Sequence, residues 1–277
     1  MEKILLAINS AQVNVNTIDF ACYIANLTRS KLTAIFLENP EAVPAVTSFP
    51  GGIYAESVLQ PGLPANTERS NQWEQNVRVF ESVCKNRGVT SCIHRDIGVP
   101  TEEVVFESRF ADMLIVEAEM SFHDKPEGLP TPVVKEVLAK SECPVVIAPY
   151  SFYGIDEIVF AYDGSASSVF AMKQFSYLLP QLSDKIVTIL QVRENGDPPS
   201  IDNHKVRELL QMHYGGIGFE FLHGKASDEL FGRLISRKNV FLVMGAFGRS
   251  MLSSFFRHST AELLIKTVNV PVFIAHH

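Results

Sequence analysis

A segment near the end of the chain carries residues suited to binding an anion. Gly245 follows the apolar run 240–244, and Gly248 comes three residues later. Glycines let backbone N–H groups approach a phosphate closely, and the start of a helix adds unpaired N–H donors with a partial positive charge. The segment continues through Arg249, His258, Ser259 and Thr260 into the helix-forming residues 261–267. We therefore predict a phosphate-binding turn between a strand and a helix.

These polar residues also have ordinary structural explanations. An arginine on a surface loop, such as Arg249, is usually just solvated. Ser259 begins the sequence Ser-Thr-Ala-Glu, a capping box that stabilises the start of a helix with no ligand present. Capping and phosphate binding are compatible, so both interpretations of Ser259 stay open.

A carboxylate stands at a second strand end. Asp163 follows the apolar run 157–162 and precedes Gly164 and Ser165. A carboxylate there accepts hydrogen bonds from ribose hydroxyls or from an adenine amino group. It can equally cap the first turn of the following helix. The spacing alone does not decide between these two roles.

The elements that position these residues alternate between short apolar runs and helix-length amphipathic segments. Five strands alternating with four helices predict a mostly parallel sheet covered on both faces, because parallel strands need crossover connections. Each half is then a doubly wound α/β domain of the Rossmann-like kind, in which ligands bind beyond the carboxyl ends of the strands. The expected strands of the second half are 157–162, 186–192, 217–222, 240–244 and 271–275, and the expected helices are 166–179, 202–213, 227–237 and 260–268.

The two halves of the chain resemble each other. The run 4–10 recurs as 158–164, the run 114–116 recurs as 242–244, and the run 143–148 recurs as 270–275. This predicts one domain written twice, over residues 1–150 and 151–277. The offset between the matching runs falls from 154 to 127 positions, so the first half carries about 27 extra residues. We place them in the Pro- and Gly-rich stretch 39–66, read as a long surface loop whose role is open: a lid, a docking segment or an excursion with no role.

Composition narrows the classes of partner and compartment. The chain has 24 Lys and Arg against 31 Asp and Glu; residues 1–150 hold 12 basic and 19 acidic side chains, and residues 151–277 hold 12 of each. Neither half has the basic excess that binding to a nucleic acid backbone needs. No run of 18 apolar residues suits a membrane span, and the first residues do not form a signal peptide, so we expect a cytoplasmic protein. The four cysteines form no C-x-x-C pair and read as reduced core thiols.

Taken together, the strand-end residues resemble the universal stress protein family. Its nucleotide-binding members carry G-x2-G-x9-G followed by Ser or Thr, and here Gly245 and Gly248 are followed after nine residues by His258 and Ser259. Asp163 after the first strand and the closing run 269–274 are also similar to that family. The resemblance covers both halves, as in a tandem member, and implies an adenine nucleotide alpha hydrolase-like fold.

The resemblance implies that the C-terminal half binds an adenine nucleotide. Asp163 then holds the adenosine moiety and Val192 contacts the base. The glycine turn with Arg249, Ser259 and Thr260 holds the ribose and the phosphates. His258 departs from the family pattern, because it stands where the third glycine belongs, and it either crowds the phosphates or donates a hydrogen bond to them. The choice among ATP, ADP and AMP, with or without Mg²⁺, stays open.

The first half lacks the matching residues. Its first strand ends in the neutral Asn9, and Glu117 and Met120 stand at the positions of the two glycines, with Glu119 between them. Carboxylates repel phosphate, and Pro132 lacks one of the N–H groups that an anion would use. We therefore expect the first half to bind no nucleotide and to serve a structural or regulatory purpose.

Two alternative functions are carried forward. One is slow ATP hydrolysis assisted by His258 or Asp163, although no Walker lysine, pyrophosphatase loop, H-E-x-x-H or C-x-x-C motif supports an enzyme or a metal site. The other is a ligand-free module that acts through protein contacts.

The apolar last strands, 145–148 and 272–275, would otherwise be exposed edges, so we expect the halves to pair there as an internal pseudo-dimer. Whether two chains form a homodimer is open.

Overall fold

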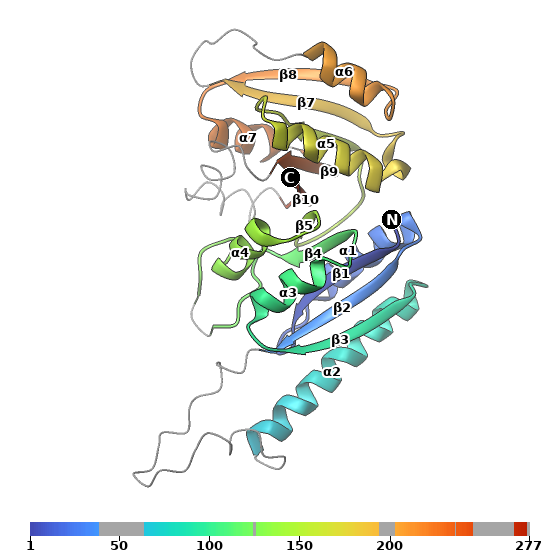
Figure 1. Cartoon of the computed structure of the whole chain (residues 1–277), viewed down its shortest axis with the longest axis vertical. Helices are drawn as coiled ribbons and strands as arrows, with labels where there is room; N and C mark the ends of the chain where they lie inside the picture. Colours follow the sequence, from blue (N-terminus) through green and yellow to red (C-terminus); the bar gives the residue numbers. More distant parts are fainter. Residues whose placement is uncertain (39–63, 124–125, 194–202, 236, 246–268, 276–277) are drawn as a thin grey trace.

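The computed structural model describes residues 1–38, 64–123, 126–193, 203–235, 237–245 and 269–275. Strands and helices alternate along both halves (Figure 1). The N-terminal half, residues 1–150, contains β1 (Lys3–Asn9), α1 (Val15–Thr28), β2 (Lys31–Glu38), α2 (Pro64–Asn86), β3 (Ser91–Ile97), α3 (Pro100–Ser108), β4 (Met113–Glu117), α4 (Pro132–Lys140) and β5 (Val145–Ala148).

The C-terminal half, residues 151–277, follows a similar plan. It contains β6 (Glu157–Ala161), α5 (Ala166–Leu178), the short 3₁₀ helix η3 (Pro180–Leu182), β7 (Ile186–Arg193), α6 (Asn203–Gln211), β8 (Ile217–His223), α7 (Ala226–Ile235), β9 (Val240–Gly245) and β10 (Val272–Ala275). The predicted α/β class is confirmed, and the expected strand ranges agree with the observed ones to within a residue. The expected helix 260–268 lies outside the described residues.

The ten strands of the described residues belong to one sheet with the order β3-β2-β1-β4-β5-β10-β9-β6-β7-β8. Within each half the paired strands are parallel. The order reverses between β1 and β4 in the N-terminal half, and between β6 and β9 in the C-terminal half. These are the points where an open α/β sheet forms a crevice for a ligand.

The two halves meet at their last strands, as the apolar sequences of these strands predicted. β5 and β10 pair in antiparallel fashion, with Phe273 opposite Val146. Beside this seam, the side chain of Asn269 donates to Ser151 O at 3.0 Å and accepts from Ser151 N at 3.0 Å. The pairing hides two strand edges that would otherwise present unpaired backbone groups.

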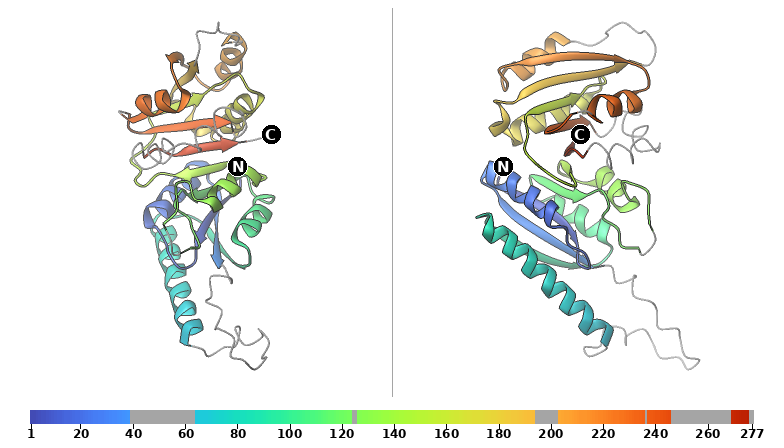
Figure 2. Two further views of the ribbon diagram at one scale, coloured as in Figure 1. Left: turned by 90° about the vertical axis from the view of Figure 1, so that its left-hand side faces the viewer. Right: turned by 180° about the vertical axis from the view of Figure 1, so that it is seen from behind.

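The sheet separates two hydrophobic cores, with helices on both faces (Figure 2). Successive side chains of a strand point to opposite faces, so Ile4 and Leu6 of β1 enter the first core and Leu5 enters the second. Helices α1, α2, α5 and α6 cover the first core, and α3, α4 and α7 cover the second. Because both faces are covered, inner strands such as β1 and β9 are continuous apolar runs, whereas the edge strands β3 and β8 include polar, exposed residues.

Part of the extra length of the N-terminal half forms a longer helix. We expected a loop over 39–66, but α2 begins at Pro64, so the last three residues of that range are helical; residues 39–63 lie outside the described residues. α2 has 23 residues, whereas α6 at the same place in the C-terminal half has 9. Proline is favoured in the first turn of a helix, which accounts for the early start. In the described part of the chain, no helix has the length and apolar character needed to cross a membrane.

Candidate functional site

Three predicted site residues lie at the carboxyl ends of three neighbouring strands. In the register of the sheet, Ala161 of β6 is level with Leu190 of β7 and with Met244 of β9. Asp163 lies two residues beyond Ala161, Val192 lies two residues beyond Leu190, and Gly245 comes directly after Met244. The other predicted residues, Gly248, Arg249, His258, Ser259 and Thr260, lie outside the described residues.

Asp163 shapes the turn that leads into α5, but it is not the cap of that helix. Its Oδ1 accepts a hydrogen bond from the backbone N–H of Ser165 at 2.9 Å. The cap is Ser165, whose hydroxyl oxygen accepts from the N–H of Ser168 at 3.1 Å. The helix start is therefore capped without Asp163, and within the described residues Oδ2 of Asp163 has no hydrogen-bond donor.

Gly245 is required by the packing of a helix on the sheet. A Cβ atom at this position would lie 2.5 Å from both the carbonyl carbon of Ser167 and the nitrogen of Ser168, which belong to the first turn of α5. These are backbone atoms that cannot move aside without shifting the helix. The sequence explained this glycine by close approach of an anion, and the structure adds close approach of α5.

In the N-terminal half, the connection between the first strand and the first helix is longer. Glu117 ends β4 at the position of Gly245, and α1 begins at Val15, six residues after Asn9, while α5 begins only three residues after Asp163. The first turn of α1 is thus set back from the strand end, where Glu117 carries a full side chain. The residues of this connection, 10–14, form one wall of a cavity.

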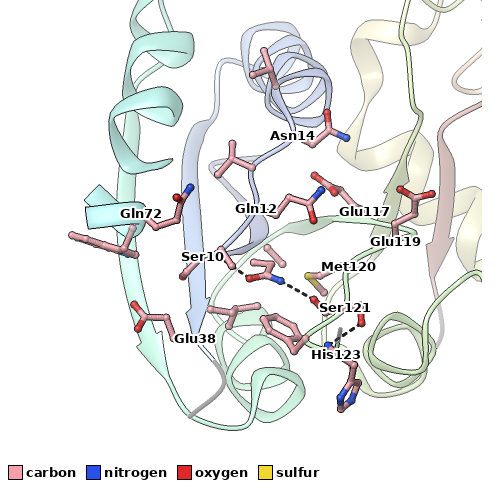
Figure 3. A pocket seen from close by; sticks show the side chains of 18 residues that line it. Ser10, Gln12, Asn14, Glu38, Gln72, Glu117, Glu119, Met120, Ser121 and His123 are labelled. Atoms are coloured by element: carbon pink, nitrogen blue, oxygen red, sulfur yellow. Dashed lines mark hydrogen bonds between the residues drawn. The ribbon is translucent and has the colours of Figure 1, made fainter. Parts of the chain in front are cut away.

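This N-terminal cavity, about 810 Å³ in volume, opens at the carboxyl ends of β1, β2 and β4 (Figure 3). The connection 10–14, the start of α1, residues of α2 and the segment 119–123 complete its lining. Its position is the switch point between β1 and β4, where the topology places a ligand crevice. The sequence did not predict Gln12, Gln72 and Trp73 in this wall, because they lie on a connection and a helix that carry no recognised motif.

The lining of the N-terminal cavity is acidic, as its sequence predicted. It includes Glu38, Glu117 and Glu119 but no Lys or Arg. Glu38 accepts a hydrogen bond from Arg95 Nε at 2.7 Å, and Glu119 accepts one from the hydroxyl of Tyr150 at 2.9 Å. Burial raises the pKa of Glu117 to about 7, the charge of Glu119 adds to the rise, and a hydrogen bond with Thr17 opposes it.

Thr131, which stands at the start of α4, is engaged within the chain itself. The N–H of Thr131 donates to Ala118 O at 3.1 Å, and its hydroxyl donates to Met120 O at 2.5 Å. The same hydroxyl oxygen accepts from the N–H of Val134 at 3.3 Å, and Pro132 has no N–H to offer. The start of α4 is therefore capped internally.

Asn9 is also fully engaged. Its Oδ1 accepts from the N–H of Ala11 at 2.9 Å, in the same way that Asp163 accepts from Ser165. Its Nδ2 donates to Ser121 O at 2.7 Å and ties β1 to the segment after β4. A carboxylate such as Asp163 has no N–H for a tie of this kind and can only accept.

Comparisons with known proteins agree with the topology. No family model matches the chain. Universal stress protein Slr1230 of Synechocystis sp. PCC 6803 is 22% identical over 98% of this chain and 99% of its own length. The crystal structure of a universal stress protein from Archaeoglobus fulgidus has a TM-score of 0.69 at 18% identity, covering 99% of this chain and 96% of that one. A protein from Pseudomonas aeruginosa provisionally named a universal stress protein has a TM-score of 0.57 at 17% identity, covering 100% of this chain and 93% of that one. The predicted resemblance to the universal stress protein family is thus confirmed along nearly the whole chain, in sequence and in fold.

Proposed function

We propose that this protein is a stress-response or signalling protein that binds an adenine nucleotide in its C-terminal half. The observation that carries the proposal is the position of Asp163, Val192 and Gly245 at the carboxyl ends of β6, β7 and β9. These strand ends are at the switch point of this half, where the topology predicts a ligand crevice, and the sequence of the glycine turn follows Gly245 directly. The named relatives, all called universal stress proteins, support the assignment to stress response.

In this proposal each residue has a defined role. Asp163 accepts hydrogen bonds from the ribose hydroxyls or the adenine amino group through Oδ2, while Oδ1 keeps its bond to Ser165. Val192, which packs on the second core, lies against the base. Gly248, Arg249, His258, Ser259 and Thr260 provide the phosphate contacts. No proton transfer is needed, so the role is binding and not turnover.

The N-terminal half does not bind nucleotide phosphates in this proposal. Two carboxylates occupy the place of the glycine turn, and Thr131 already accepts from the N–H groups of Val134 and Lys135 at the start of α4. An anion there would meet repulsion from the carboxylates and compete with Thr131 for these donors. The protein therefore takes up one nucleotide per chain.

The test is calorimetric titration of the full chain with ATP, ADP and AMP, each with and without Mg²⁺. We expect one site per chain. Asp163→Asn keeps the Oδ1 acceptor for Ser165 but removes the charge, so nucleotide affinity should fall about tenfold, the value of one charge-assisted hydrogen bond. Phosphate release in the same samples checks whether the nucleotide is hydrolysed.

The matched control is Asn9→Asp, the reciprocal change in the N-terminal half. It should leave nucleotide affinity within about twofold of the original, since that half holds no phosphate in this proposal. No saturable binding of any of the three nucleotides would overturn the function. Two sites per chain, or full affinity in Asp163→Asn, would overturn the assignment of the site.

A further inference from the structure

Helix α3 is apolar on its outer side as well as on the side that packs on the sheet. On the inner side Val104 and Ser108 are buried, and Val104 belongs to the second core. On the outer side Phe106 is 51% exposed, and Phe110, two residues past the end of the helix, is 60% exposed. Val99, just before the helix, is half exposed. A surface helix normally presents polar side chains to water, so this outer side needs an explanation.

These apolar residues form one surface and are not scattered. Val99, Phe106 and Phe110 follow one another at intervals of seven and four residues, which places them along one side of a helix. The rings of Phe106 and Phe110 lie 5.6 Å apart in edge-to-face contact. In Figure 1, α3 lies between α4 and β3, and α4 presents mostly charged residues at its exposed positions: Lys135, Glu136 and Lys140. A contiguous apolar surface of this kind is typical of a site of protein contact.

Two charged side chains flank the apolar residues. Glu102 in the first turn of α3 is exposed, and it makes no hydrogen bond or ion pair within the described residues. Arg109 follows the last turn, where its guanidinium lies 5.5 Å from the ring of Phe106 and its Nε donates to Glu142 at 2.7 Å. The other N–H groups of this guanidinium have no acceptor in the described part of the chain. We call Val99, Glu102, Phe106, Arg109 and Phe110 together the α3 face.

The α3 face is complementary to itself. When two copies of a helix lie antiparallel, a two-fold axis relates each residue to one on the other side of the midpoint. One axis then places Glu102 opposite Arg109 of the second copy, Phe106 opposite its own counterpart, and Val99 beside Phe110 of the second copy. The midpoints of all three pairs lie between residues 104 and 106, so a single axis serves them all. The antiparallel arrangement also sets opposite ends of the two helix dipoles side by side.

We propose that a second copy of this chain docks antiparallel on the α3 face and forms a homodimer. Its centre is the aromatic contact at Phe106, and two symmetric ion pairs between Glu102 and Arg109 set its direction. A helix of nine residues gives a small interface, of the size found in transient complexes, so dimer formation depends on concentration. Both contributing surfaces lie in the N-terminal half, and the dimer is therefore independent of the proposed nucleotide site.

The first test is sedimentation equilibrium of the full chain between about 5 µM and about 1 mM. The average mass should rise from 30.8 kDa toward twice that value, with a dissociation constant on the order of 100 µM. Phe106→Asp removes the apolar centre and opposes two like charges, so the dimer should weaken at least about tenfold. The control is Tyr153→Asp, an exposed aromatic position outside the α3 face, which should leave association unchanged.

Two outcomes of this measurement would overturn the inference. A monomer at every concentration would leave the α3 face to a different partner protein. Undiminished association in Phe106→Asp would place the contact between copies elsewhere on the molecule. Circular dichroism checks that each variant is folded.

A charge-exchange experiment tests the antiparallel arrangement itself. Glu102→Arg and Arg109→Glu each oppose like charges across the two-fold axis, so each variant alone should associate at least about tenfold more weakly than the original chain. In an equimolar mixture the new cation of one variant faces the new anion of the other, and the original Arg109 faces the original Glu102. The mixture should therefore recover dimers to within about threefold of the original affinity.

A mixture that associates no better than the separate variants would contradict the pairing of Glu102 with Arg109. Both positions are exposed, so this experiment stays valid even if Phe106→Asp disturbs the fold. Asp163→Asn should dimerise as the original chain does. The dimer and the proposed nucleotide site can thus fail separately.

Discussion

At the scale of single residues, the same backbone position serves different chemistry in the two halves. Asp163 and Asn9 both accept a hydrogen bond from the N–H two residues later, so the turn does not depend on the charge. The difference lies in the second polar atom, which in Asn9 donates to Ser121 O. The carboxylate of Asp163 therefore keeps an acceptor oxygen without a partner among the described residues, whereas the amide of Asn9 links the end of β1 to the segment after β4.

A prediction at this scale concerns Glu117. Its pKa in the folded protein is raised from 4.5 to about 7, mainly by burial. The folded state then binds a proton that the unfolded state has lost, so stability falls as pH rises from about 4.5 to about 7. Glu117→Gln removes this titration. We expect the variant to gain stability over the original protein across that interval, by on the order of 2 kcal/mol at pH 8.

Urea unfolding at pH 4.5, 6 and 8 measures this difference. The matched control is Glu208→Gln, an exposed change on α6 in the other half of the chain, which should change stability little. A stability difference for Glu117→Gln that stays constant between pH 4.5 and 8 would show that Glu117 is not protonated in the folded state.

At the scale of elements, a helix can pack directly on the backbone of a strand. Gly245, the last described residue of β9, lies against the first turn of α5, with Ser167 and Ser168 in the place of a side chain. Alternating apolar runs predicted both elements from the sequence, but not this contact, since residues 167 and 245 are far apart along the chain. The same limit applies to Trp73, which reaches the N-terminal cavity from α2.

Gly245→Ala tests the packing of α5 on β9. The added methyl group would overlap backbone atoms of α5, so we expect a loss of about 1–3 kcal/mol in the free energy of unfolding. The control is Gly232→Ala in α7, where a methyl group meets no atom within 4 Å. That change should be neutral or stabilising by up to about 1 kcal/mol, since alanine favours helices. Equal stability of the two variants would argue against the contact.

Much of the architecture could be predicted from the sequence, because strands and helix starts are marked by residues that are close together along the chain. Continuous apolar runs mark strands buried on both faces, and the Thr131-Pro132 pair marks the start of α4. Contacts between distant residues were not accessible. Cys22 and Cys84 were expected to be core thiols, and they are buried, but nothing in their spacing indicated that their sulfur atoms lie 3.7 Å apart between α1 and α2. The cavity was missed for the same reason, because three of its walls come from segments with no motif.

At the scale of the whole molecule, one sheet joins the two halves through β5 and β10. Phe273 of β10 is fully buried and its ring lies 5.2 Å from that of Phe175 in α5, so the seam is continuous with the core. The domain boundary that we propose near residue 150 therefore divides the sequence, but the sheet and the hydrophobic core continue from one half into the other. We expect both halves to unfold together.

Phe273→Ala tests this coupling, because the single tryptophan, Trp73, reports on the N-terminal half while the substitution is in the C-terminal half. Loss of a buried phenylalanine costs about 3–5 kcal/mol, and tryptophan fluorescence and circular dichroism should show the same lowered midpoint. Phe221→Ala, at a 41% exposed position on the edge strand β8, is the control and should change the midpoint little. An unchanged fluorescence midpoint in Phe273→Ala would mean that the halves unfold independently.

The antiparallel seam has a geometric consequence for any pair of ligands. Since β5 and β10 run in opposite directions while each half is parallel inside, the carboxyl ends of the two halves face opposite rims of the sheet. A molecule on one rim cannot touch a molecule on the other. Any communication between them must cross the four strands between the two switch points, β4, β5, β10 and β9, and so must pass the seam of two four-residue strands.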